Sequence, residues 1–222
     1  MSHSVHPYAH RLATIRDWQS RWFGVRGQYQ LYLKADISIR EYLEKRLRGF
    51  LVDRIEIERG PNVYRVIVKT ARPGLIIGRN GEGAVKLKDD LLALLRRIKV
   101  PMPKEFKLDI EEVKHPETHA ALAAQMVAEG LEKRLPFKRV VKQVIEKAMA
   151  SKLVLGVKMT VAGRLGGADI ARTETVKKGR LPLQTLRADI DFAKEKAYLA
   201  YGVIGVKVWI YRGDIFETQN AK

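Results

Sequence analysis

Two groups of residues have the types and spacing needed to bind a polyanion. Gly78-Arg79-Asn80-Gly81 is a GxxG sequence, in which two glycines let the backbone approach a nucleic-acid strand closely. Lys138, Arg139 and Lys142 fall on one side of a helix, because positions 138 and 142 are one turn apart and position 139 lies about 100° round. Both groups predict phosphate binding without bond chemistry.

Catalytic and metal-binding interpretations have weaker support. His115 and His119 stand four residues apart at an expected helix start, but they do not form HExxH and no third ligand is evident, so we expect no metal. Asp189 and Asp191 share one face of an expected strand and, with Arg187 beside them, predict a surface ion-pair network. There is no cysteine and no P-loop sequence. We therefore expect a protein that is not an enzyme, with no catalytic residue and no cofactor.

The composition favours a nucleic-acid partner. The 222 residues include 42 Lys+Arg and 25 Asp+Glu, which gives a net charge of +17, and 46% are hydrophobic, enough for folded cores. No stretch approaches the ~18 consecutive apolar residues of a membrane-spanning helix. The bases are spread through folded segments and not gathered on one amphipathic helix, so a nucleic acid is favoured over a membrane surface.

The excess charge is concentrated in residues 133–180, which carry 13 bases and three acids. A solvated protein face usually mixes both signs, whereas a face of one sign suits a polyphosphate, which releases counterions when it binds. Besides the three bases of the expected helix, RNA contacts are expected from bases of the later part of this segment. These are Arg164, Arg172, Lys177, Lys178 and Arg180.

The first half of the chain predicts a helix over 38–47, strands over 52–58 and 63–70, the GxxG loop, a helix over 84–98 and a third strand over 106–111. This order resembles a type II KH domain, in which the GxxG loop clamps single-stranded RNA. The resemblance implies RNA contacts from the loop and from the base before it. These residues are Arg72, Gly78, Arg79, Asn80 and Gly81.

The second half predicts helices over 121–135 and 140–148, followed by a strand over 154–162 and a basic stretch to Gly179. Strands over 183–192 and 203–211 follow, with a helix over 193–198 between them. The expected fold class is α+β. We predict an N-terminal arm (1–38), a KH domain with a three-stranded sheet (39–112), an α+β domain with helices on a mostly antiparallel sheet (113–213) and a tail (214–222).

Several further blocks occur in the order found in the bacterial-type small-subunit ribosomal protein S-three family, which the chain resembles over almost its whole length. The blocks include Ala71-Arg72-Pro73-Gly74, Ala162-Gly163-Arg164-Leu165-Gly166-Gly167-Ala168, Leu186-Arg187-Ala188-Asp189-Ile190-Asp191 and Tyr201-Gly202-Val203-Ile204-Gly205-Val206-Lys207-Val208-Trp209-Ile210. Any one block could arise by chance, but their common order is specific.

The resemblance implies a structural protein of the small-subunit head that binds 16S-type rRNA and lines the channel through which mRNA enters. It assigns mRNA contact and unwinding without NTP hydrolysis to Lys138, Arg139 and Lys142, with Lys138 standing where arginine is commoner. Asn80 stands where a base is usual in the family, so the GxxG loop carries one positive charge fewer. The implied protein neighbours are small-subunit proteins ten and fourteen, with protein two as a further candidate, and no homo-oligomer is expected. The implied location is the ribosome, in the cytoplasm or in an organelle.

Two other classes of function remain open. A free regulatory KH protein would bind single-stranded RNA through the GxxG loop and lose binding on Gly81→Asp. A nuclease or lyase would need a cluster of metal-binding carboxylates or an exposed catalytic lysine, and the sequence offers no convincing example of either.

Overall fold

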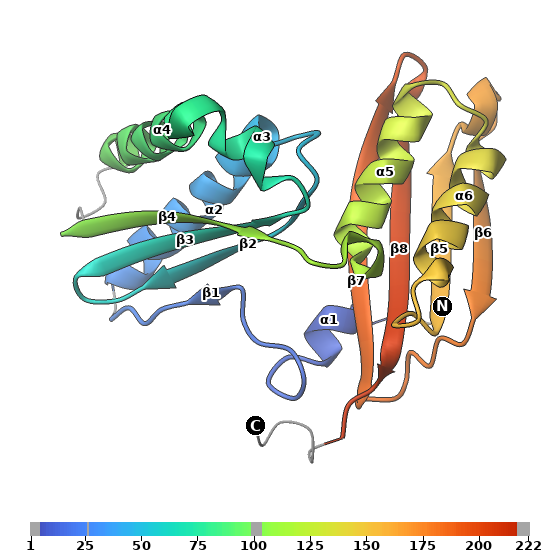
Figure 1. Ribbon diagram of the computed structural model, residues 1–222, viewed down its shortest axis with the longest axis horizontal. Coiled ribbons are helices and arrows are strands. Elements are labelled where there is room, and N and C mark those ends of the chain that lie inside the picture. The colour runs from blue at the N-terminus through green and yellow to red at the C-terminus, as the bar shows by residue number, and fades with distance from the viewer. Residues whose placement is uncertain (1–4, 26, 99–103, 217–222) are drawn as a thin grey trace. The chain divides into compact units, whose positions relative to one another are not determined.

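Two separate cores form in the computed structural model, which describes residues 5–25, 27–98 and 104–216 (Figure 1). One unit is Trp18–Lys114, and the other joins Met1–Asp17 to His115–Lys222. The α+β class is confirmed in both units, since each combines helices with a sheet. Of the expected tail, residues 217–222 lie outside the described part of the chain, as do residues 1–4 of the expected arm.

The sheet of the unit Trp18–Lys114 contains the three predicted KH strands and one short addition. Its order is β1 (Ser20–Arg21), β2 (Val52–Arg59), β3 (Val63–Thr70) and β4 (Glu105–Glu112). The Gly60-Pro61-Asn62 turn makes β2 and β3 an antiparallel pair, while β4 lies parallel to β3 and β1 parallel to β2. The predicted strands therefore form, and residues of the expected arm extend their sheet.

Three helices supply the apolar side chains that cover this sheet. They are α2 (Gly27–Arg46), α3 (Pro73–Ile77) and α4 (Glu82–Ile98). In α4 the leucines at 87, 91 and 95 repeat every four residues and are all buried, which places one side of the helix on the core. The other core residues from helices include Ala35, Ile39, Leu43 and Ile76.

A buried carboxylate ties the start of this unit to its core. Asp36 accepts hydrogen bonds from the Ser20 hydroxyl (3.0 Å), the Trp22 indole (2.7 Å) and the Tyr64 hydroxyl (3.2 Å). The Arg59 guanidinium lies 3.5 Å from Asp36 and 4.2 Å from the centre of the Tyr64 ring. Burial and the neighbouring Asp36 charge raise the pKa of Tyr64, so its hydroxyl keeps its proton and remains a donor at alkaline pH as well.

The C-terminal unit is a sheet with helices on one face (Figure 1). The strand order is β6 (Arg172–Gly179), β5 (Gly156–Gly163), β8 (Gly202–Asp214) and β7 (Ala188–Leu199), and every neighbouring pair is antiparallel. Helices α5 (Ala120–Glu132) and α6 (Phe137–Ala150) pack on alternate residues of these strands. The strand residues buried under the helices include Val157, Met159, Val161, Ile204, Val206, Val208 and Ile210.

The structure corrects three local predictions. The predicted helix over 193–198 is wrong, because β7 pairs with β8 without interruption from Ile190 to Leu199 and this long-range pairing outweighs local helix propensity. The basic stretch before Gly179 is strand β6, which pairs with β5 along its whole length. Helix α2 begins at Gly27, well before position 38, so the expected arm ends inside a helix.

The expected arm is also divided between the two units. Its first part includes α1 (Pro7–His10), and Arg11 next to it is fully buried. The Arg11 guanidinium donates hydrogen bonds to the carbonyl oxygens of Pro7 (2.9 Å), Leu183 (3.0 Å), Thr185 (2.8 Å) and Ala188 (2.7 Å). Three of these carbonyls belong to residues 183–188, so one guanidinium fixes residues 7–11 to the rest of the C-terminal unit.

None of the described helices combines the length and apolar character needed to cross a membrane.

We predict that Arg11→Ala lowers the free energy of unfolding of the C-terminal unit by about 2–4 kcal/mol, because buried carbonyls lose their donor. Chemical denaturation followed by circular dichroism measures the change, and limited proteolysis should cut earlier near residues 5–17. Arg97→Ala removes the same side chain from an exposed helical position and should change stability by less than about 0.5 kcal/mol. Equal stability of the two variants would contradict this role of Arg11.

Candidate nucleic-acid interface

The GxxG loop forms a tight, exposed connection between α3 and α4. Gly78 and Gly81 have φ angles of 73° and 81°, in the left-handed region that glycine enters without steric cost. Asn80 also has a positive φ, 52°, which asparagine tolerates better than most residues. The side chains of Arg79 and Asn80 are exposed. The loop therefore presents backbone and one guanidinium to solvent at the start of α4, where the helix dipole favours an anion.

Gly83 allows α3 and α4 to approach each other closely. The sequence analysis does not identify this residue. A Cβ at this position would lie 2.4 Å from the Ile76 carbonyl oxygen and 2.9 Å from that of Ile77. The end of α3 and the first turn of α4 are thus in backbone contact, which sets the geometry of the loop between them. Arg72, the other predicted residue, is exposed immediately before Pro73 at the start of α3.

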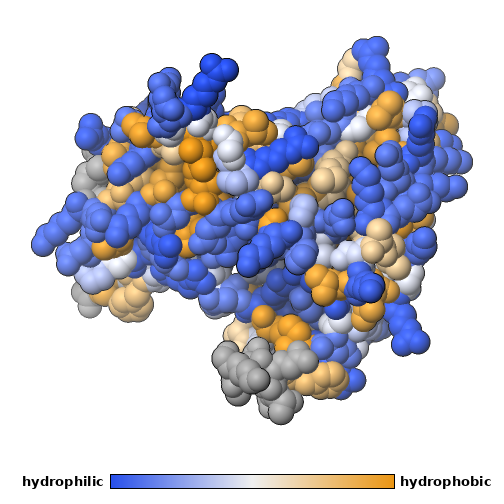
Figure 2. All heavy atoms as spheres, viewed as in Figure 1, coloured by the Kyte–Doolittle hydropathy of each residue, from blue (hydrophilic) through white to orange (hydrophobic). Residues whose placement is uncertain are grey.

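The predicted basic helix is α6, and its three bases lie together. Lys138, Arg139 and Lys142 are exposed, and all three line one open surface hollow together with Gln143 and Glu146. The opposite side of α6 is buried in the core, which keeps the bases facing solvent. The buried residues of α6 are Val140, Val141, Val144, Ile145 and Ala148. In the view of Figure 2, hydrophilic residues predominate over this part of the surface.

Arg172 joins this group through an aromatic contact. Its guanidinium carbon lies 5.7 Å from the centre of the Phe137 ring, and the Lys138 ammonium lies 6.0 Å from the same ring. Both distances suit cation–π attraction. The first residue of α6 therefore brings a base of β6 next to the basic helix, a proximity that sequence spacing could not indicate.

The other predicted bases of the C-terminal unit are in different environments. Arg164 is partly exposed but is engaged within the chain, since it donates to the Ala168 carbonyl (3.0 Å) and pairs with Asp169 (2.9 Å). Lys177 and Lys178 are both exposed but, as neighbours on strand β6, point to opposite faces of the sheet. Arg180 is exposed just after β6. The predicted group is thus several separate positions and not one patch.

The paired aspartates form an ion-pair network, although not with the expected base. Arg212 lies 2.9 Å from Asp191 and 3.9 Å from Asp189, and Arg16 also pairs with Asp189. The Asp191 carboxylate accepts a hydrogen bond from the backbone N–H of Ala120 at 2.8 Å, at the start of α5. Arg187 instead pairs with Asp214. Asp191 is buried, so the network is largely internal rather than at the surface.

The two candidate RNA-binding groups are rich in cations, and such groups hold anions and not metal ions. Comparison with known proteins agrees with this chemistry. Residues 38–118 match a model of the KH domain, and residues 127–210 match a model described as ribosomal protein S3, C-terminal domain.

Curated relatives match the chain over nearly its full length. The small ribosomal subunit protein uS3 of Caldicellulosiruptor saccharolyticus is 46% identical over 221 residues, which cover 100% of this chain and 96% of that protein. The chain belongs to the ribosomal protein S3 family. The proteins of the same name from Pseudomonas aeruginosa strain UCBPP-PA14 (45% identity, 97% of this chain and 91% of that protein) and Maridesulfovibrio salexigens (45%, 99% of each) are similar to it to the same degree. Members of this ribosomal protein family are structural proteins and not enzymes.

We predict that Gly83→Ala lowers the stability of the unit Trp18–Lys114 by about 1–3 kcal/mol, because the new methyl group would press on two carbonyl oxygens. Thermal unfolding followed by circular dichroism measures the loss. Gly74→Ala is the matched control, since a Cβ there would have no heavy atom within 4 Å. A Gly83→Ala protein as stable as Gly74→Ala would show that the loop does not depend on this backbone contact.

Proposed function

We propose that this protein is a structural constituent of the small ribosomal subunit, where it binds ribosomal RNA and flanks the path of mRNA. The observation that carries the proposal is the cluster of Lys138, Arg139 and Lys142 on the exposed side of α6, continued by Arg172. Each phosphate that these bases neutralise releases condensed counterions, so the interaction is strong at low salt and independent of base sequence.

The proposed action on mRNA is electrostatic and steric. The buried side of α6 fixes the helix on the sheet, so its bases can hold phosphates of one RNA strand without moving with them. When translocation pulls mRNA past such a surface, a strand held there stays apart from its pairing partner. No NTP hydrolysis by this chain is required. Lys138 contributes a point charge and not the bidentate fork of arginine, so its contact is with phosphate charge alone.

The remaining parts of the proposal concern the KH loop and the neighbours. Residues 78–81, with Arg72, are proposed to contact RNA backbone through the glycine conformations and the Arg79 charge. The proposed setting is the head of the small subunit in the cytoplasm, beside 16S-type rRNA and small-subunit proteins ten and fourteen, with protein two as a further neighbour. These neighbours follow from the family resemblance.

A second candidate function is that of a free regulatory KH protein, favoured by the exposed GxxG loop alone. In that case Gly81→Asp would abolish RNA binding by the isolated protein, because it places a strained, negatively charged residue at φ 81°. Sedimentation of the protein apart from small subunits in a sucrose gradient would favour this second function.

We predict that changing Lys138, Arg139 and Lys142 to Gln slows translation through a stable mRNA hairpin severalfold and leaves translation of an unstructured message unchanged. The three side chains are exposed, so folding should be unaffected. Single-message translation with subunits carrying the variant measures both rates.

The matched control is K133Q/K147Q/K152Q, which removes the same charge from exposed residues of the same unit that do not line the hollow. This control should translate hairpins at the normal rate. Equal slowing of structured and unstructured messages, or equal slowing by the control, would contradict a role for α6 in separating mRNA strands.

A further inference from the structure

The face of the C-terminal sheet that α5 and α6 leave uncovered carries a second group of bases. Strand register assigns alternate residues to it, because their neighbours point into the core under the helices. These residues form cross-strand rows, in which Lys177 lies opposite Lys158, and Lys207 opposite Lys194. The lysines of this uncovered face are Lys158, Lys177, Lys194, Lys196 and Lys207.

The strand positions that register places on the uncovered face include no acid. They are the alternate residues 173 to 177 of β6, 158 to 162 of β5, 203 to 209 of β8 and 192 to 198 of β7. Glu174 and Glu195 lie opposite Val161 and Val206, two core residues, and so belong to the other face. No Asp or Glu of the described chain makes an ion pair with Lys158, Lys194 or Lys207. Like charges on neighbouring strands repel, so this arrangement costs stability unless an anion covers it.

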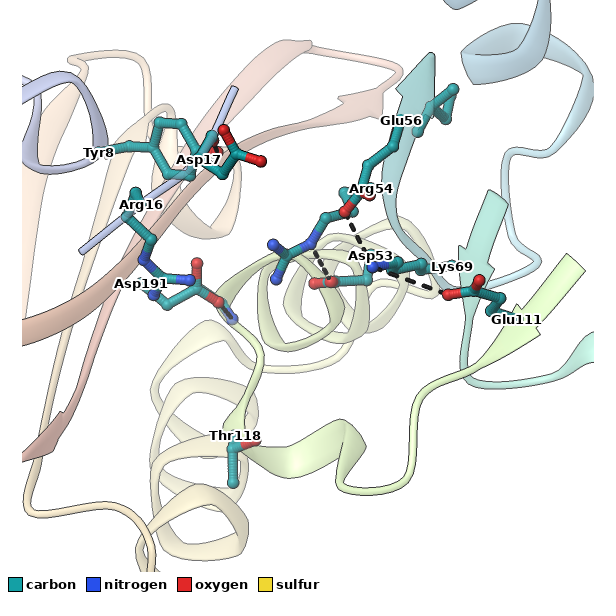
Figure 3. Close-up of polar contacts among 12 residues, drawn as sticks. Tyr8, Arg16, Asp17, Asp53, Arg54, Glu56, Lys69, Glu111, Thr118 and Asp191 are labelled. Atoms are coloured by element: carbon teal, nitrogen blue, oxygen red, sulfur yellow. Dashed lines mark hydrogen bonds and ion pairs between the residues drawn. The ribbon is translucent and has the colours of Figure 1, made fainter. Parts of the chain in front are cut away.

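On the corresponding face of the KH sheet, by contrast, the bases are neutralised by acids of the same chain. There Lys69 lies between Glu56 (2.9 Å) and Glu111 (3.7 Å), as Figure 3 shows, and Arg65 pairs with Asp109. On strands β2 to β4, register places four bases and five acids on that face. They are Arg54, Arg65, Lys69, Lys107, Glu56, Glu58, Glu105, Asp109 and Glu111. One sheet face is thus balanced by intramolecular pairs, whereas on the other Lys158, Lys194 and Lys207 make no ion pair with an acid of the described residues.

Aromatic residues stiffen the uncovered face and define what it can bind. The Lys158 ammonium lies 5.0 Å from the centre of the Trp209 ring, and Lys194 lies 5.6 Å from that of Phe192. Phe192 is also in contact with the rings of Trp209 (5.0 Å) and His6 (4.8 Å, edge on). The rings of Phe192 and Trp209 are partly covered by their neighbours and hold the lysines in place, so Tyr198 at the end of β7 is the one exposed ring on which an unpaired base could stack among the described positions of this face.

We propose that this uncovered face of β6, β5, β8 and β7 binds the sugar–phosphate backbone of duplex RNA within the ribosomal RNA, as an interface distinct from the α6 bases and the GxxG loop. Charge complementarity selects a polyanion, and lysines act as point charges on phosphate without reading base sequence. An array of five lysines spread over four strands can follow the phosphates of a duplex backbone. The inference rests on the proposed RNA-binding function and adds a surface to it.

The test is the salt dependence of binding by the full-length protein to a mixed-sequence RNA duplex of about 16 base pairs, a span that a duplex-binding domain covers. Changing Lys194, Lys196 and Lys207 to Gln should reduce the slope of log affinity against log salt by about two to three and weaken binding at least about tenfold at 0.1 M salt. K194R/K196R/K207R keeps the charge and should keep the slope.

A matched control, K104Q/K107Q/K114Q, removes the same charge from exposed positions of the other unit. An unchanged slope in the Gln variant of the uncovered face, or an equal loss in this control, would overturn the inference. So would unchanged duplex binding together with lost binding to phosphatidylserine vesicles, which would assign the face to a lipid surface. If K138Q/R139Q/K142Q weakens duplex binding and K194Q/K196Q/K207Q does not, the inference about the sheet face is wrong while the proposed RNA-binding function still stands. If the unaltered protein does not bind the duplex, the proposed function fails as well.

Discussion

The electrostatic repulsion among lysine and arginine side chains is the interaction that the rest of the structure has to overcome. A chain with a net charge of +17 is destabilised by its own charge unless its cores hold the bases apart and outward. In the C-terminal unit the holding contact is the packing of Val140, Val144 and Ile145 of α6 over β5, within the same apolar layer that α5 forms over β7 and β8. Because that apolar layer fixes both the helix and the sheet, the bases on the outer side of α6 and on the uncovered side of the sheet cannot move away from one another. They are preorganised for an anion that the protein itself does not supply.

The two units handle charge in opposite ways, and this difference assigns their roles. In the KH unit the uncovered sheet face contains ion pairs such as Lys69 with Glu56. The RNA contacts that we propose for this unit therefore come from its GxxG loop, with Arg79, and from Arg72. In the C-terminal unit acids are used inside the structure, where Asp191 receives Arg212 and the first backbone N–H of α5. Other bases at the surface, such as Arg164 and Arg187, pair with acids of this unit, whereas Lys138, Arg139 and Lys142 of α6 make no ion pair within the described residues, and we propose that these bind phosphate. Such a division suits a protein held in an RNA assembly by many charge contacts, with no need for a reactive centre.

Local patterns in the sequence were enough to predict most of the elements that carry these groups. One side of each element is marked by regularly spaced apolar residues: alternate residues in β2 and β3, the leucines in α4 and the valines in α6. This spacing alone predicts these helices and strands, and it also predicts that Lys138, Arg139 and Lys142 lie together. Non-local pairing was beyond that reasoning. The local sequence of residues 193–198 predicts a helix, because nothing nearby shows that β8 pairs with them. Only that pairing reveals the alternation that puts Lys194 and Lys196 on one face. The place of Arg172 beside Phe137 and the burial of Arg11 depend in the same way on contacts between distant parts of the chain.

The most direct measurement of where RNA lies on this protein is ultraviolet crosslinking of intact small subunits that contain it, with the crosslinked peptides identified by mass spectrometry. We predict that crosslinks concentrate in the C-terminal unit, on peptides from α6, β6 and the lysine-bearing strands β7 and β8, with a smaller group at residues 72–81. The ion-paired strands β2 to β4 should give few. Crosslinks concentrated on β2 to β4, with none in the C-terminal unit, would contradict the claim that unpaired bases held by the C-terminal core are what bind RNA.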